Sequence, residues 1–351
     1  MSVAEARGTA PLQIAEHILS IRRAPARREE LVALLAEQSA IYRGLGMGDA
    51  ERIRGFVLAS FEALGLPDSA LPFVLEELET GINPYTMAAA AKALRGARQV
   101  SDRTLALLVS AAGRVESNDD NVQYDTMDPG DRVAPRTSAL AEIMGTIAAL
   151  RDRAHGGPTD QAGEHCCCAS PPAPVLSAPS PTLRSIDDLA LQDQSGVNFA
   201  YRDFFYRRPS VLTFFYTRCM NPKKCSLTIS KLGSLQRRLA AINLQSCINI
   251  GAFTYDPAYD RASRLQTYGM DRGFRFDDRN RFIRTTGSFE PIRAKFDLGV
   301  GFGPATTNRH SVELLILDSE GETVYESRRA LWDEGEVLQA IGEILKPGSG
   351  N

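Results

Sequence analysis

The apolar residues change their spacing about halfway along the chain. Up to about residue 154 they recur at the three-to-four-residue period of amphipathic helices. From about residue 188, short continuous apolar runs alternate with helical patterns, as in a sheet covered by helices. Residues 156–181, between them, are rich in Gly, Pro, Ala and Ser, a composition typical of a tether. We therefore expect a helical domain (1–155), a linker (156–182) and an α/β domain (183–351).

The first domain is expected to be a stack of helices without strands. Six helices in three consecutive antiparallel pairs would form an α-solenoid, and residues 71–94 resemble one HEAT-type repeat. An irregular helical bundle is the alternative. No group of residues in this half has the pattern of a catalytic site. Its surface is expected to bind a protein or peptide partner. The helical patterns cover residues 26–45, 49–64, 67–81, 84–96, 101–111 and 137–153, with Asp49, Asn83 and Ser101 as N-caps.

Charge and hydropathy narrow the classes of partner and compartment. The net charge is −3, so the chain lacks the excess of positive charge that is typical of nucleic-acid-binding proteins. The N-terminal residues contain no apolar run of signal-peptide length, and no window is apolar enough for a transmembrane helix. We expect a cytoplasmic protein without a membrane anchor. In a reducing cytosol, clustered cysteines are more often metal ligands or redox-active thiols than structural bridges.

The six cysteines are clustered, and all lie in the second half of the chain. Cys219 and Cys225 form a close pair, and Cys247 stands alone within an apolar segment, so we expect Cys247 to be a buried strand residue. The linker carries a run of four potential ligands. These are His165, Cys166, Cys167 and Cys168.

Thiolates and imidazole are soft ligands that suit Cu(I) or Zn(II). Bridging between neighbouring cysteines is disfavoured because the resulting disulfide is strained. The linker cluster is therefore interpreted as a metal or redox site. An incidental run of exposed thiols is the alternative. Because the linker is a tether, this cluster could reach a site in the second domain.

The second domain reads as a thioredoxin-like fold. An apolar strand at residues 210–216 is followed by Cys219 and Cys225 in a loop, and then by a helix. We expect a hairpin at 188–199, further strands at 245–253 and 312–317, and a last helix at 333–345. Asp260 is expected to cap the helix that starts at residue 261, or to orient the side chain of His310, a residue just before the strand at 312–317.

Five segments in this order resemble the Sco/SenC family of thioredoxin-fold copper proteins. They are VLTFFYTRC, FTYDPAYD, LQTYG, TTGS and NRHSVELLILDSEGETVY, within residues 183–345. The resemblance implies that Cys219, Cys225 and His310 bind copper, as Cu(I) or Cu(II). The family usually has three residues between its cysteines, whereas this chain has five, two of which are lysines.

The chemistry of this site has several interpretations. In the first, the protein is a metallochaperone that holds copper and exchanges it with the linker cysteines. In the second, Cys219 and Cys225 are the catalytic pair of a thiol–disulfide oxidoreductase, with Arg218, Lys223 and Lys224 favouring the thiolate. In the third, a copper-dependent enzyme acts on a peptide or small molecule presented by the helical domain. A purely structural module is the fourth. The sequence leaves open whether the protein is an enzyme.

Overall fold

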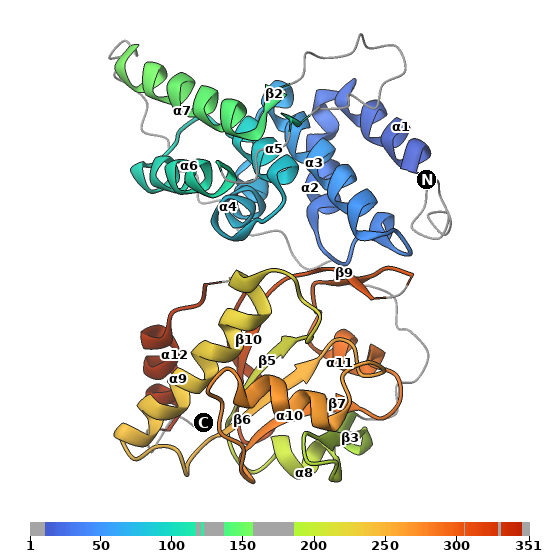
Figure 1. Cartoon of the computed structure of the whole chain (residues 1–351), viewed down its shortest axis with the longest axis vertical. Coiled ribbons are helices and arrows are strands. Elements are labelled where there is room, and N and C mark those ends of the chain that lie inside the picture. Colours follow the sequence, from blue (N-terminus) through green and yellow to red (C-terminus); the bar gives the residue numbers. More distant parts are fainter. Residues whose placement is uncertain are drawn as a thin grey trace.

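The structure is a computed structural model that describes residues 11–116, 121–122, 137–156, 186–304, 306–328 and 331–345. A mainly helical half lies against a half built around a mixed sheet (Figure 1). Within the described ranges, every helix is too short or too polar to cross a lipid bilayer.

The N-terminal half is built from helices that pack around one apolar core. Helix α3 packs against α5, and α7 packs against both α5 and α6. As expected, Asn83 and Ser101 cap the helices that follow them, through hydrogen bonds to the backbone N–H groups of Tyr85 and Thr104. The helices are α1 (Pro11–Arg22), α2 (Arg28–Leu35), α3 (Met47–Leu64), α4 (Leu71–Thr80), α5 (Pro84–Leu94), α6 (Asp102–Val115) and α7 (Ala139–Gly156).

Four expectations for this half are wrong in detail. The described residues form seven helices rather than six, because α1 precedes the first helix that was expected. The helix predicted at residues 26–45 ends at Leu35, because the buried Arg54 guanidinium donates to the Leu35 carbonyl, which a longer helix would use. Asp49 does not cap α3, which begins two residues earlier, after Gly46. A short antiparallel pair, β1 (Asn121–Val122) and β2 (Thr137–Ser138), is present where no strand was expected.

The C-terminal half is organised around a seven-stranded sheet with the order β11-β10-β5-β6-β7-β3-β4. Strands β5, β6 and β7 are parallel, and the flanking pairs are antiparallel. Every residue of β5 and β6 is buried, as their continuous apolar runs predicted. The strands are β3 (Ala190–Asp193), β4 (Asn198–Ala200), β5 (Ser210–Phe215), β6 (Asn249–Thr254), β7 (Asn280–Thr285), β10 (Leu314–Leu317) and β11 (Thr323–Ser327).

Helices flank this sheet and close its core (Figure 1). Helix α9 follows the cysteine loop and packs against the last helix, α12. The helices are α8 (Tyr201–Phe205), α9 (Leu227–Ala241), α10 (Ala262–Met270), α11 (Glu290–Lys295) and α12 (Glu334–Ile344). The strands and covering helices agree with the thioredoxin-like domain that the sequence predicted.

A separate hairpin connects the two halves. Strands β8 (Val300–Phe302) and β9 (Thr307–His310) pair with each other and lie beneath the helical half (Figure 1). The Asn308 amide donates to the carbonyl oxygens of Tyr42 (2.8 Å) and Leu45 (3.0 Å), and the Gly44 N–H donates to the Phe302 carbonyl (3.0 Å). The strand that ends in His310 is therefore held from the helical side.

Candidate metal centre

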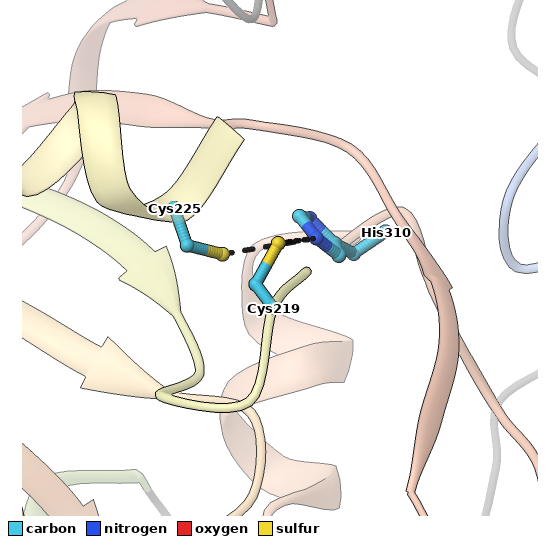
Figure 2. Close-up of side chains that lie close together, drawn as sticks. All are labelled: Cys219, Cys225 and His310. Carbon is cyan, nitrogen blue, oxygen red and sulfur yellow. Dashed lines mark hydrogen bonds between the residues drawn. The ribbon is translucent and has the colours of Figure 1, made fainter. Parts of the chain in front are cut away.

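Cys219, Cys225 and His310 come together at one end of the sheet. Their possible ligand atoms all lie within 4.8 Å of one another. His310 Nε2 is 3.3 Å from Cys219 Sγ and 3.7 Å from Cys225 Sγ, and the three side chains point toward one another (Figure 2). Cys225 is fully buried, whereas Cys219 is partly exposed. The structure thus assembles the three residues that the sequence nominated, which are 91 positions apart at most.

The five residues between the cysteines form a compact turn rather than an open loop. Pro222–Ser226 is a tight turn that is kinked at Lys224, whose backbone angles are not helical, and the Asn221 side chain accepts a hydrogen bond from the Lys223 N–H (2.9 Å) at its start. This turn leads directly into α9 and places Cys225 two residues before the helix begins. The longer spacing is therefore accommodated without separating the two thiols.

Asp260 anchors the loop that carries Cys219. Its buried carboxylate accepts hydrogen bonds from the Thr217 N–H (3.0 Å), the Thr217 hydroxyl and the Thr254 hydroxyl (2.5 Å). Both expectations for Asp260 are therefore wrong, since the N-cap of α10 is Arg261 and no hydrogen bond from Asp260 to His310 is formed. The carboxylate instead fixes the chain two residues before the first cysteine.

The imidazole of His310 is oriented by its backbone neighbour. Nδ1 lies 2.8 Å from the Ser311 carbonyl oxygen and donates to it, so Nε2 is the ring nitrogen that faces the thiols. The Tyr216 ring meets the imidazole edge-on at 5.3 Å, and the Tyr255 ring lies 5.7 Å away. The Tyr255 hydroxyl donates to the buried Glu313 carboxylate (2.7 Å).

Sequence reasoning missed Tyr216, Tyr255 and Glu313. A signal for the two tyrosines was present, because each directly follows one of two neighbouring apolar strands. In the parallel register, Phe215 pairs with Thr254, so the next residue of each strand lies at the edge that carries Cys219. Nothing in the sequence pattern pointed to Glu313, which lies among apolar residues just before β10.

The two thiols have opposite electrostatic environments. The neighbouring Cys225 thiol lowers the pKa of Cys219 far below its ordinary value, and the His310 imidazole lowers it further against the effect of burial. Burial raises the pKa of Cys225, and the neighbouring Cys219 raises it further. The metal-free pair is thus a thiolate beside a thiol, and a soft cation can replace the remaining proton.

The neighbouring cations act differently from what the sequence suggested. Arg218 forms an ion pair with Asp256. Lys223 donates to the Glu79 carbonyl oxygen (3.2 Å), and Lys224 contacts the Glu76 carboxylate (2.8 Å). The main causes of the lowered Cys219 pKa are Cys225 and His310 rather than these cations.

A buried cluster of four charged side chains joins Arg309, the residue before His310, to the helical half. Arg309 contacts Glu37 (2.5 Å) and Glu77 (3.0 Å). Arg54 contacts the same two carboxylates, Glu37 at 3.2 Å and Glu77 at 2.5 Å. Two cations and two anions balance in this site, which excludes most water. The one sequence signal was Arg54, a charge between the apolar Ile53 and Phe56 on a buried helix.

A small cavity of about 80 Å³ lies between the two halves, beside the thiol of Cys219. Cys219 and His310 line it from the sheet half. Residues of α3, α4 and α5 line it from the helical half, so the N-terminal domain forms one wall of the site.

The third cysteine of the described residues, Cys247, is not part of this site. Cys247 is exposed, in a turn before β6, so its expected burial within a strand is wrong. His165, Cys166, Cys167 and Cys168 lie outside the described residues.

A thioredoxin-like mixed sheet with two cysteines and a histidine at one end defines a class of thiol-bearing, soft-metal domains. Within that class, residues 179–345 match the SCO1/SenC family. The C-terminal half of the chain is therefore a SCO1/SenC domain, preceded by a helical region.

Several solved structures are similar to this half. Bradyrhizobium japonicum ScoI with copper bound has 16% identity, covers 45% of this chain and 97% of its own, with a TM-score of 0.37. Yeast Sco1 with copper bound has 22% identity, with 46% and 88% covered and a TM-score of 0.38. A SCO1/SenC family lipoprotein from Bacillus anthracis has 18% identity, with 47% and 100% covered and a TM-score of 0.39. No curated protein matches the chain.

Proposed function

We propose that the protein binds one copper ion through Cys219, Cys225 and His310 and delivers it to a client. The observation that carries this proposal is the convergence of two sulfur atoms and an oriented imidazole nitrogen within 4.8 Å. Two thiolates and a neutral imidazole form a soft donor set that suits Cu(I), and with a further ligand Cu(II). The SCO1/SenC match over the same residues supports the choice of copper.

A Cu(I) titration against the chelator bicinchoninate tests this proposal. Each protein is reduced, and the variants are Cys219→Ser, Cys225→Ser and His310→Ala, with the exposed Cys247→Ser as the matched control. Each of the three site variants is expected to lose one tightly bound Cu(I), and the control is expected to lose none. Unchanged binding in all three site variants would contradict the proposal.

The thiol asymmetry favours a second candidate function, thiol–disulfide exchange. The Cys219 thiolate would attack a substrate disulfide, forming a mixed disulfide and releasing one substrate thiolate. Cys225, after losing its proton, would then displace the second substrate thiolate and leave a Cys219–Cys225 disulfide. The variant Cys225→Ser should then trap the mixed disulfide, which mass spectrometry would detect. Absence of this adduct would exclude the reaction.

We further propose that the linker residues His165, Cys166, Cys167 and Cys168 exchange copper with this site, since soft ligands on one tether have a high effective concentration. Replacing the three linker cysteines with serine should lower the Cu(I) stoichiometry by one and leave the affinity of the Cys219 site unchanged. Unchanged stoichiometry would show that the linker does not bind Cu(I).

We propose that the helical half is a HEAT-like array that binds a protein or peptide partner, and that the protein acts in the cytoplasm. The consecutive packing of α4 with α5 and of α6 with α7 supports the first idea. Cross-linking in cells followed by mass spectrometry tests for a partner on these helices, and fractionation tests the compartment. Recovery with the membrane or export fraction would contradict the cytoplasmic assignment.

A further inference from the structure

Two exposed methionines line the cavity beside the thiols, one from each half of the molecule. Met47 begins α3, and Met220 directly follows Cys219. Their exposed fractions are 39% and 75%. Met220 has no place among the ligands assigned above, and neither residue contributes to the apolar cores of the two halves.

We propose that Met47 and Met220, called here the methionine pair, form a transient Cu(I) site from which the ion passes to Cys219 and His310. Thioether sulfur is a neutral, soft ligand that selects Cu(I) over harder cations. This inference rests on the proposed copper-binding function and adds the route by which the ion arrives.

The different burial of the three ligands determines which of them an incoming ion meets first. Cys225 is fully buried and does not line the cavity, whereas Cys219 and His310 do. An ion that enters through the cavity therefore meets Cys219 and His310 first. The nearest exposed sulfur beside Cys219 along the chain is that of Met220.

The charges along the cavity also suit a cation. Lys224 and Arg309 are each paired there, with Glu76 at 2.8 Å and with Glu77 at 3.0 Å. Glu51, a third carboxylate of the lining, accepts a hydrogen bond from the Asn83 amide. The lining thus has one carboxylate more than it has cations, which favours an incoming positive ion.

The proposed transfer is ligand exchange without a change in oxidation state. Cu(I) leaves the two thioethers as bonds form to the Cys219 thiolate and the His310 Nε2. The Cys225 thiol then binds the ion and releases its proton to solvent. Anionic thiolates bind Cu(I) more strongly than neutral thioethers, so the direction of transfer is toward the buried site.

Transfer kinetics test the inference. All proteins carry Cys166→Ser, Cys167→Ser and Cys168→Ser, so that the linker does not compete. The test protein adds Met47→Leu and Met220→Leu, which keep the apolar side chain and remove the sulfur. The matched control adds Met144→Leu and Met270→Leu, two exposed methionines, one from each half, outside the cavity lining (exposed fractions 51% and 56%).

Stopped-flow transfer of Cu(I) from bicinchoninate should be about tenfold slower in the test protein. The equilibrium affinity should stay the same, and the control should match the parent in both. Equal rates in test and control, with affinity intact, would overturn this inference and leave the proposed function standing. Loss of Cu(I) binding by the parent itself would instead overturn the proposed function.

A second measurement observes the methionine pair directly. In protein labelled with ¹³C at the methionine methyl groups, with Cys219→Ser, Cys225→Ser and His310→Ala added to the linker variant, the signals of Met47 and Met220 should shift on Cu(I) addition. The signals of Met144 and Met270 should stay in place. Shifts of all four together, or of none, would contradict a site at the cavity.

Discussion

At the scale of single residues, the site depends on a difference between two identical side chains. Cys219 lies beside the Cys225 thiol and beside His310, and both neighbours favour its thiolate. Cys225 is fully buried, which favours its thiol. One negative charge in the metal-free pair costs less to bury than two, and it leaves a proton that only metal binding or oxidation removes.

This difference predicts how the two thiols react with iodoacetamide. Because its pKa is lowered, Cys219 should already be a thiolate below neutral pH, and its alkylation rate should change little between pH 6 and pH 8. Cys225 should remain unmodified over this range, because its pKa is raised and its side chain is buried. Peptide mapping by mass spectrometry measures both, with the exposed Cys247 as the internal reference. A steep rise of the Cys219 rate with pH would contradict the assignment.

The sequence predicted the metal ligands but not the residues that hold them in position. Cys219, Cys225 and His310 were found because soft ligands in an ordered family pattern are visible in the letters alone. The role of Asp260 could not be found, because its partners Thr217 and Thr254 are common residues whose proximity depends on the sheet register. Cys247 was misplaced because its apolar neighbours masked the turn that precedes β6.

At the scale of elements, β9 is the part of the site that the helical half controls. Arg309 in β9 lies next to His310 and is buried against Glu37 and Glu77. Removing one partner of a buried charge cluster leaves the others uncompensated, which costs about 3–5 kcal/mol.

The variant Glu37→Gln tests this cluster. It should lower the free energy of unfolding by about 3–5 kcal/mol, because Arg54 and Arg309 then share one carboxylate. Urea unfolding measures the loss. The matched control is Glu290→Gln, whose partner Arg293 is on the surface of α11, with an expected loss below about 1 kcal/mol. Similar losses in the two variants would contradict a special role for the cluster.

The same cluster predicts a dependence on pH. Burial alone would raise the pKa of Glu37, but the charges of Arg309 and Arg54 outweigh it and lower the pKa. In the unfolded chain this carboxyl titrates near its ordinary value of about 4.3. Its contribution to stability is therefore present above about pH 4.3 and is lost as the pH falls toward the folded-state value.

Urea midpoints measured from pH 7 down to pH 3 check this dependence. Below about pH 4.3 the stability of the unmodified protein should fall more steeply than that of Glu37→Gln, which lacks the titrating group. Parallel curves for the two proteins would show that Glu37 does not contribute.

At the scale of the whole molecule, the helical half and the sheet half share the site. The sequence predicted where one fold class changes to the other, because the hydrophobic period changes there. It could not predict their docking, since the charges that join them are residues 37, 54, 77 and 309, whose proximity arises only when both halves are folded. The lysines between the cysteines, which the sequence assigned to thiol activation, likewise contact the helical half.

This shared interface predicts that Cu(I) stabilises both halves together. A ligand held by His310 fixes β9, whose contacts extend to Tyr42, Leu45 and Glu37 in the helical half. At a free Cu(I) concentration a thousand times the dissociation constant, binding should add about 4 kcal/mol to the stability. Two probes follow the halves during thermal unfolding of the linker variant. Circular dichroism at 222 nm reports mainly the helical half, and fluorescence of the single tryptophan, Trp332, reports the sheet core.

Both transitions should coincide and should shift upward together when Cu(I) is added, because two cooperatively coupled domains unfold as one unit. In His310→Ala the shift should be strongly reduced for both probes, whereas Cys247→Ser should behave like its parent. If the fluorescence transition alone moved, the halves would unfold independently, and the helical half would be a separate module rather than a wall of the metal site. The outcome therefore shows whether the helical half only binds partners or also holds His310 in place.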